Sequence, residues 1–482
     1  YFAGLLLLGR SFQDQDSSDD YFLAGRENAS WLAGISVVAT LLSTVTYLAL
    51  PGEMIRNGAG YVTSLLAFVF VIPTVNRLII PTLMQLRAAS IYDYLERRYS
   101  RPVRSLGAGL FVATRLIWMS LILYIAARSL HPMTGWSPPL LIVVTGCITL
   151  IYTTLGGMRA VVWSDFAQFI ILFGCALFIP IYIGLQTSST PVDWLEAFRE
   201  AERSAVPLFS FDPTERTTIV GMIVMLYVWN ICTHGADQVA AQRYLSTPSA
   251  AAAKRSFWVF SIGNVGLLML IMVVGLALFY FRFHAAGLPL AEFQSMIRPI
   301  ADDVFPEFLA KQLPPGASGL MLAALLAAAM SSVSSGINSI AAVVSSDWLK
   351  SRLTQTAANR MKRLRTFSAI TGGLAICGAL GVNELMLRAD WNFVDLMERL
   401  NHLFVAPLGA LFFAGICFSR VGTTAALTGF AAGVVVSIAI SFSEALLNYN
   451  ISFMWIMPAS FAASLLTAAA CSWAWPRSRS EK

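Results

Sequence analysis

The stretch AALLAAAMSSVSS at residues 323–335 joins an apolar run to four serines, and the interpretation of the whole chain begins from it. Ser331 lies three residues before Ser334 and four before Ser335, so a helix brings their hydroxyls onto one face. A hard cation such as sodium takes several oxygen ligands, and neutral hydroxyls and carbonyls let it leave again. Small residues on one face are also typical of close packing between membrane helices, so both interpretations remain open here.

The composition around this stretch is that of a membrane protein. Hydrophobic residues make up 57% of the 482 residues and charged residues 12%, whereas a soluble chain carries about 25% charge. Lipid is therefore the better solvent, and we expect an all-α integral membrane protein with about thirteen transmembrane helices. The first apolar run, residues 1–9, is too short to span a bilayer and is interpreted as a truncated helix. The expected helices are 1–9, 30–52, 61–83, 104–130, 138–155, 161–185, 217–235, 256–281, 317–347, 364–382, 401–418, 421–441 and 452–475.

The basic residues gather in loops that fall on one side when the helices alternate. These loops are 84–104, 236–256 and 349–365, whereas the segments 186–216 and 282–316 on the other side are acidic. The positive-inside rule then places the basic loops and the C-terminal tail in the cytoplasm, with the chain in the plasma or inner membrane. The formal charge of +6 is explained by this topology, and we expect no nucleic-acid partner.

Cysteine and histidine give no sign of a metal centre or of catalysis. All six cysteines lie in apolar stretches without metal spacing, so we expect small buried hydrophobic residues and no disulfide framework. The four histidines show no metal spacing either, and no nucleophile–base pair is apparent. The sequence therefore predicts a protein that is not an enzyme.

Three charged residues interrupt apolar segments, where an ionised side chain is costly. Asp165 opens a long apolar helix, so it either caps that helix at the water interface or binds a cation. Arg115 lies well inside another helix, and Arg399 directly precedes the run that contains Pro407. Each arginine either belongs to a structural ion pair or recognises an anionic group, because a guanidinium fork suits a carboxylate.

Four blocks of sequence, in order along the chain, resemble the sodium/solute symporter family of sodium-coupled sugar, proline, sialic acid, iodide, vitamin and monocarboxylate transporters. They are DYFLAGR at residues 20–26, GGMRAVVWSD at 156–165, the segment 237–245 and the serine helix at 328–339. One block alone would be weak evidence, but four in order are specific. The stretch 90–135 is most similar to the branch that carries monocarboxylates, vitamins and iodide.

The resemblance implies a LeuT-type fold of two inverted five-helix repeats, with the substrate near the bilayer midplane where the first helix of each repeat is broken. We expect the breaks at residues 41–46 and 230–234, although neither contains Gly or Pro. The implied organisation is a partial N-terminal helix and cytoplasmic linker at 1–29, repeats at 30–185 and 217–418, and two peripheral helices at 421–475.

The resemblance also implies sodium as the coupling ion. The family's common sodium site combines backbone carbonyls of the first core helix and the serine helix with two hydroxyls, at Ala39, Leu42, Ala328, Ser331 and Ser332. Some members hold a second sodium, at positions that correspond to Asp165, Ser331, Ser334 and Ser335. The complete set favours two sodium ions per cycle, although members with one sodium also keep the aspartate.

The substrate positions of the family fall on Ser43, Thr46, Trp118, Asn230, Asn264 and Arg399, to which Arg115 is added for its charge. Thr46 and Arg399 stand where sugar carriers have glutamine, which disfavours a hexose. The sequence therefore favours a small organic anion resembling a monocarboxylate, a vitamin or sialic acid. A sodium/sugar or sodium/amino-acid symporter of the same fold is the alternative.

The resulting hypothesis is a symporter that works as a monomer in the lipid bilayer by alternating access. Sodium braces the first core helix against the serine helix and so completes the solute pocket. A transporter-like membrane sensor is an alternative of a different class, against which the short C-terminal tail argues. A sodium-independent carrier or channel of the same fold is the other, against which the serines argue.

Overall fold

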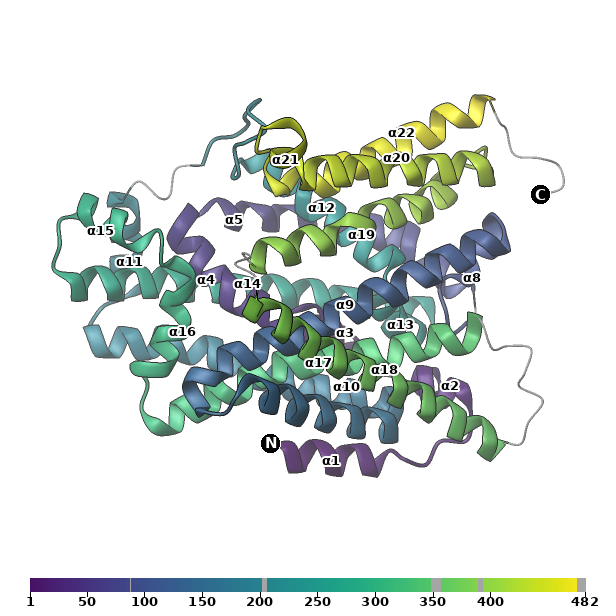
Figure 1. The fold of residues 1–482 in the computed structure, drawn as a ribbon, viewed down its shortest axis with the longest axis horizontal. Helices are drawn as coiled ribbons and strands as arrows, with labels where there is room; N and C mark the ends of the chain where they lie inside the picture. The colour runs from purple at the N-terminus through teal and green to yellow at the C-terminus, as the bar shows by residue number, and fades with distance from the viewer. Residues whose placement is uncertain (87, 202–205, 348–356, 389–392, 475–482) are drawn as a thin grey trace.

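The computed structural model describes residues 1–86, 88–201, 206–347, 357–388 and 393–474, with only the backbone described at residues 315, 357–358, 388 and 393–402. Every secondary-structure element in this part of the chain is a helix (Figure 1). The tail after residue 474 and residues 349–356 of the expected basic loop at 349–365 lie outside the described residues, whereas the rest of that segment belongs to the helix Ala357–Arg388. The orientation of the chain therefore stays a prediction.

The α-helices run in chain order from the N-terminal α1 to the C-terminal α22. Their bounds are α1 Phe2–Ser11, α2 Ser18–Leu23, α3 Ser30–Leu41, α4 Thr44–Asn57, α5 Gly60–Thr63, α6 Phe68–Thr74, α7 Ile80–Met84, α8 Asp93–Arg98, α9 Arg101–Thr134, α10 Pro138–Thr187, α11 Pro191–Glu200, α12 Ile219–Ala236, α13 Gln238–Leu245, α14 Ala250–Ala286, α15 Leu290–Ile297, α16 Ala301–Lys311, α17 Pro315–Asp347, α18 Ala357–Arg388, α19 Phe393–Cys417, α20 Thr423–Ser441, α21 Ser443–Leu447 and α22 Ile456–Ala474. Short 3-10 and π segments link α2 to α3, join α5, α6 and α7 into one rod, and precede α22.

Within the described residues, nine helices are long and apolar enough to cross a membrane, and the bent pair α3–α4 makes a tenth. The helix α10 has 50 residues, about 75 Å at 1.5 Å per residue, which exceeds the ~30 Å hydrocarbon core of a bilayer. It turns at Gly157, whose φ of 55° and ψ of −147° are not helical. A Cβ there would lie 2.6 Å from the carbonyl oxygen of Tyr21, so glycine is required. The expected total of thirteen spans stays a prediction.

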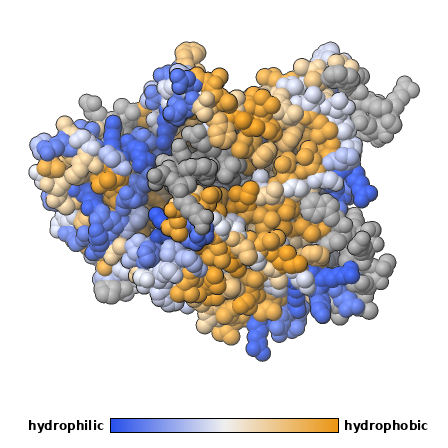
Figure 2. Space-filling view, viewed as in Figure 1, coloured by the Kyte–Doolittle hydropathy of each residue, from blue (hydrophilic) through white to orange (hydrophobic). Residues whose placement is uncertain are grey.

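The surface has the layout of a transmembrane protein. Figure 2 shows an apolar belt across the middle of this face, with hydrophilic residues gathered toward the left and right ends. The short helices α11, α15 and α16 lie at the left end, and α2 and α8 at the right (Figure 1). The helices α15 and α16 both belong to the acidic segment 282–316.

The expectation that all cysteines are buried is wrong. Cys175 and Cys232 are buried, but Cys147, Cys377 and Cys417 are exposed on apolar helices. An apolar side chain on a membrane helix can face lipid as well as the core, which hydrophobicity alone does not distinguish. None of the six forms a disulfide, as expected.

The first expected helix break is confirmed. The helix α3 ends at Leu41, Leu42 is extended (φ −80°, ψ 98°), and α4 leaves at 66° to α3. Ser43 is also extended and accepts a hydrogen bond from the backbone N–H of Thr46 at 3.3 Å. A serine N-cap therefore starts the second half, where the sequence offers neither Gly nor Pro.

The second break lies further along the chain than expected. The helix α12 runs without interruption through Asn230 and His234 and ends at Ala236. Asp237 is extended (φ −92°, ψ 117°), and its carboxylate accepts from the N–H of Val239 at 2.8 Å to begin α13. The break is thus set by an acidic N-cap, which is a stronger start signal than the polar residues inside the preceding apolar run.

Two arginines that were counted as loop charges are buried. Arg104 pairs with Asp93 at 2.9 Å and with Asp347 at the end of α17. Arg243 lies in α13 and is fully buried against Asp165. Neither contributes a solvated loop charge, because each is neutralised by carboxylates inside the protein.

The serine helix α17 is the centre of the arrangement. It contacts α3, α9, α10, α13 and α18, whereas α20 and α22 pack mainly on each other and on α19. Figure 1 shows α20 and α22 along one edge, in agreement with a peripheral pair. The repeat boundaries themselves stay a prediction.

Candidate functional site

The serine face of α17 meets the end of α3. The Ser331 hydroxyl donates to the carbonyl oxygen of Ala39 at 2.9 Å and lies 3.0 Å from that of Ala328. The Ser332 hydroxyl donates to the carbonyl of Thr40 at 3.0 Å. All of these residues are buried. We call this group the oxygen cluster.

The break in α3 explains why these carbonyls are available. Ala39 and Thr40 lie in the last turn before Leu42, where carbonyls have no N–H donor four residues further on. The hydroxyls of α17 take the place of those donors. Five neutral oxygens thus converge between two helices, which is the ligand type that a hard monovalent cation prefers.

The structure brings the residues of the predicted common sodium site close together. Ala39, Ala328 and Ser331 are joined by the hydrogen bonds given above, and Ser332 binds Thr40, the neighbour of Ala39. Leu42 is buried at the break itself. Which atoms hold an ion stays a prediction.

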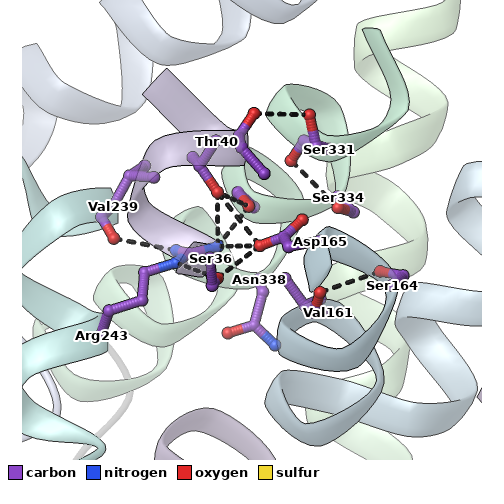
Figure 3. Close-up of polar contacts among 12 residues, drawn as sticks. Ser36, Thr40, Val161, Ser164, Asp165, Val239, Arg243, Ser331, Ser334 and Asn338 are labelled. Carbon is purple, nitrogen blue, oxygen red and sulfur yellow. Dashed lines mark hydrogen bonds and ion pairs between the residues drawn. The ribbon is translucent and has the colours of Figure 1, made fainter. Parts of the chain in front are cut away.

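A second, charged centre lies one helical turn further along α17 (Figure 3). Asp165 and Arg243 are both fully buried, and the guanidinium lies 3.3 Å from Oδ2 of the carboxylate. Ser36 and Thr40 of α3 donate to the same oxygen, Thr40 at 3.1 Å. Arg243 also donates to the hydroxyl of Ser335. We call this group the charged centre.

Sequence reasoning missed Arg243 because it was assigned to a loop. It lies in α13, where its guanidinium also donates to the carbonyl of Val239 at 2.8 Å. The available signal was that its segment, 237–245, carried one of the four family-like blocks. A supposed linker with a family motif is better interpreted as part of a site.

Of the predicted second sodium site, Asp165 and Ser335 belong to this centre, whereas Ser331 belongs to the oxygen cluster. Ser335 contacts both Thr40, at 2.9 Å, and Arg243, whereas the Ser334 hydroxyl donates to the carbonyl of Ser331 at 3.1 Å. The other carboxylate oxygen of Asp165, Oδ1, is buried and has no hydrogen-bond partner within the described chain. The same holds for Oε1 of Gln168, three residues along α10. Two unpaired acceptors on one helix face suit a cation, although Arg243 already balances one charge.

The predicted substrate positions are only partly brought together. The hydroxyls of Ser43 and Thr46 lie 3.3 Å apart at the first break. Asn230 is buried and donates to the carbonyl of Leu226 at 2.8 Å, which leaves its Oδ1 unpaired within the described residues. Trp118 is half-buried and Asn264 buried. Among the described side chains, no hydrogen bond joins Ser43 and Thr46 to Trp118, Asn230 or Asn264.

The two predicted arginines have different outcomes. Arg115 of α9 is ion-paired with Asp237 at 3.2 Å, beside Gly336 of α17, so its charge is matched by the cap of the second break. Arg399 belongs to α19, but its side chain lies outside the described residues. Anion recognition by Arg115 and by Arg399 therefore stays a prediction.

Comparison with known proteins agrees with this architecture. The model of the sodium:solute symporter family matches residues 21–433. The chain is 29% identical to the sodium/sialic acid symporter SiaT of Proteus mirabilis, over 91% of this chain and 87% of that one. It is 28% identical to the mouse sodium-coupled monocarboxylate transporter 1, over 91% of this chain and 72% of that one.

Solved structures give the same fold. The structure of a substrate-bound, outward-open Na⁺-coupled sialic acid symporter superposes with a TM-score of 0.86 at 25% identity and covers 98% of this chain and 96% of that one. The nucleobase-cation symporter Mhp1 shares the fold alone, with a TM-score of 0.54 at 13% identity, covering 94% of each chain. The fold is of the LeuT type, and the chain belongs to the sodium:solute symporter family.

Proposed function

We propose that this protein is a sodium-coupled symporter that moves a small organic solute across the cell membrane by alternating access. The observation that carries the proposal is the oxygen cluster, in which Ser331 and Ser332 of α17 meet the carbonyls at the broken end of α3. The relatives named above are sodium-coupled, which supports the same coupling here.

Sodium would couple to the solute through the break between α3 and α4. An ion in the oxygen cluster bridges α3 and α17, and the hydroxyls of Ser43 and Thr46 lie within a turn of the last α3 carbonyls. Fixing the end of α3 therefore fixes the start of α4, which presents these hydroxyls. A ligand shifts a conformational equilibrium only by its differential affinity, so sodium must bind the outward-facing state more tightly.

A second sodium is proposed beside Asp165. Its unpaired Oδ1 and the nearby Ser334 hydroxyl supply acceptors, while Arg243 holds the other carboxylate oxygen. Each sodium that crosses a potential of 100 mV contributes about 2.3 kcal/mol of driving force. Two sodium ions with a monoanion would carry one net positive charge inward.

The solute is proposed to be an organic anion of the monocarboxylate or sialic acid kind. The names of the relatives support this class, and the buried amide of Asn230 and the hydroxyls at the first break suit a hydroxylated carboxylate. An anion would have to replace Asp237 as the partner of Arg115, or bind Arg399. A sugar or an amino acid is the alternative. A sugar is uncharged, so it would not need an arginine that is released from its ion pair.

We further propose that the protein acts as a monomer in the lipid bilayer, with its basic loops and C-terminus in the cytoplasm. The clustering of Lys and Arg in the loops at 84–104 and 349–365 supports this orientation. Accessibility of cysteines introduced at Glu292 and Arg363, on opposite ends of the molecule, to a membrane-impermeant reagent would test it.

The experiment that tests the coupling is thermal unfolding of the purified protein in sodium, potassium and choline chloride. Each salt is combined with monocarboxylates, sialic acid, sugars and amino acids. We expect sodium alone to raise the unfolding temperature, and one solute class to raise it further only when sodium is present. If sodium acts no differently from potassium and choline, the oxygen cluster is not a sodium site and the proposal fails.

A further inference from the structure

A cavity far from the oxygen cluster lies where the N-terminal segment crosses α18. The link between α1 and α2, residues 12–17, is called the strap here. A cavity of about 640 Å³ lies between the strap, Thr154 of α10 and one face of α18, within the range of ligand pockets. Its lining is Gln13, Asp14, Gln15, Asp16, Thr154, Met361, Lys362, Arg365, Thr366 and Ala369.

The strap is fixed at this place by hydrogen bonds to both neighbouring helices. Arg365 donates to Gln15 Oε1 at 3.1 Å and to the carbonyl of Gln13. Gln15 in turn donates to the carbonyl of Leu155 at 3.3 Å. Tyr21, directly after the strap, binds Thr154 at 3.1 Å. The cavity is thus bounded by ordered chain.

The cavity carries charges of both signs on opposite walls. Asp14 and Asp16 lie on the strap, and Lys362 and Arg365 lie one turn apart on α18. The side chains of Asp14, Asp16 and Lys362 are exposed and make no hydrogen bond or ion pair with other side chains of the described residues. A lining with two acids facing two bases fits a zwitterion better than a simple anion or cation.

The cavity also lies beside the part of α18 where charged residues give way to uncharged ones. The first turns of α18 hold Arg360, Lys362, Arg363 and Arg365, and from Thr366 to Asn383 the helix carries no charged residue. The residues of α18 that line the cavity also change from charged to apolar, from Lys362 at one end to Ala369 at the other. Directly beyond it, Ile370 and Leu374 are 52% and 54% exposed on the lipid-facing surface. A ligand here would have a charged end next to an apolar end.

We infer that this cavity binds the headgroup of a phosphatidylethanolamine molecule of the surrounding bilayer. Lys362 and Arg365 bind its phosphate, and the carboxylates of Asp14 and Asp16 accept hydrogen bonds from its primary ammonium. The acyl chains continue along the exposed face of Ile370 and Leu374. Phosphatidylcholine fits less well because its ammonium has no N–H to donate. Phosphatidylglycerol fits less well because it has no cation for Asp14 and Asp16.

The test measures binding of defined lipids to the purified full chain in detergent. Dioleoyl phosphatidylethanolamine, phosphatidylcholine and phosphatidylglycerol are titrated and counted by native mass spectrometry, with soluble glycerophosphoethanolamine as a fourth ligand. We expect phosphatidylethanolamine to bind most tightly. Lys362→Ala should weaken it about fivefold or more through the loss of a charge-assisted hydrogen bond.

Two further variants distinguish the site from general attraction to lipid. Arg363→Ala removes the same charge from the next residue of α18, which does not line the cavity, and should leave binding unchanged. The double variant Asp14→Asn with Asp16→Asn should abolish the preference for phosphatidylethanolamine over phosphatidylcholine. Since these side chains are exposed, the unfolding temperature without lipid should stay at the wild-type value.

Three outcomes would overturn the inference. Equal weakening by Lys362→Ala and Arg363→Ala would show diffuse electrostatics instead of a site. Binding of phosphatidylglycerol as tight as that of phosphatidylethanolamine would show a simple anion site. Equal affinity for glycerophosphoethanolamine would show a receptor for a soluble zwitterion, in which the bilayer has no part.

Discussion

Between α3 and α4 the chain breaks at Leu42, and hydroxyls meet the carbonyls that the break releases. Between α12 and α13 it breaks at Asp237, and the surroundings are charged: Arg115 binds the carboxylate that caps α13, and Arg243 of α13 binds Asp165. The first break thus exposes neutral oxygens, which a cation can occupy and leave. The second is held by ion pairs, so it is suited to fixing α13 against its neighbours. The two breaks therefore differ in chemistry, with neutral hydrogen bonds at the first and ion pairs at the second.

The largest effect is expected from separating the buried ion pair. Arg243→Met leaves the Asp165 carboxylate buried without its cation, which should cost about 3–5 kcal/mol of unfolding free energy. The double variant with Asp165→Asn removes both charges and should recover most of that loss. Unfolding of the purified protein in detergent measures both. A single variant as stable as wild type would show that the charges do not stabilise the second break.

A smaller effect is expected at the neutral break. Ser332→Ala removes one hydroxyl from the oxygen cluster, and the sodium concentration for half-maximal thermal stabilisation should rise about tenfold, the equivalent of one hydrogen bond. Ser345→Ala, on the same helix α17 and outside the cluster, is the control and should have no effect. If both variants raised this sodium concentration equally, the effect would come from a general change in α17 and not from the loss of an oxygen in the oxygen cluster.

The pair Arg115–Asp237 decides between a structural role and anion recognition. In a cycle of Arg115→Gln and Asp237→Asn, a structural pair should show about 1 kcal/mol of coupling in stability, a modest value because Asp237 is partly exposed. Asparagine keeps the helix cap, so the cycle isolates the charge. If Arg115 instead binds the solute, Arg115→Gln should raise the half-saturating solute concentration, whereas Asp237→Asn should lower it because the anion no longer has to displace a carboxylate.

The smallest effect is expected from the cap of α4. Ser43→Ala removes the oxygen that accepts from the N–H of Thr46, and the loss of a serine N-cap costs about 1 kcal/mol of unfolding free energy. Ser43→Asp restores an acceptor and makes the first break resemble the second. It should therefore recover the stability, whereas a variant less stable than Ser43→Ala would show that the neutral break excludes charge.

Much of the architecture could be predicted because it depends on composition and order. The all-α membrane fold, the family and the transporter rather than enzyme class are confirmed by the family model and by the relatives. The first break was placed correctly from the resemblance, although residues 41–46 contain neither Gly nor Pro and only the N-cap Ser43 marks it. There the helix ends through tertiary contacts of α17, which no local pattern reports.

What the sequence could not show was which charges find partners. Arg104 and Arg243 were interpreted as loop charges, and Arg115 either as part of a structural ion pair with an unknown partner or as an anion receptor. Each forms an ion pair with a carboxylate distant in sequence. Such pairs depend on the packing of α9, α13 and α17, and local patterns do not contain that information. The break at Asp237 was missed for a simpler reason, since the acidic N-cap was present but was not weighed.

The strap also places a constraint on the order in which the protein is made. Gln13 of the strap and its partner Arg365 are 352 residues apart, and Tyr21 of α2, just after the strap, is 347 residues from its partner Ser368. At a synthesis rate of roughly 5–20 residues per second, the N-terminal segment waits roughly 20–70 s after synthesis before α18 exists to receive it. During that interval the polar groups of the strap must be satisfied by water or by other proteins at the membrane surface. The strap is thus synthesised long before the residues of α18 that hold it in place.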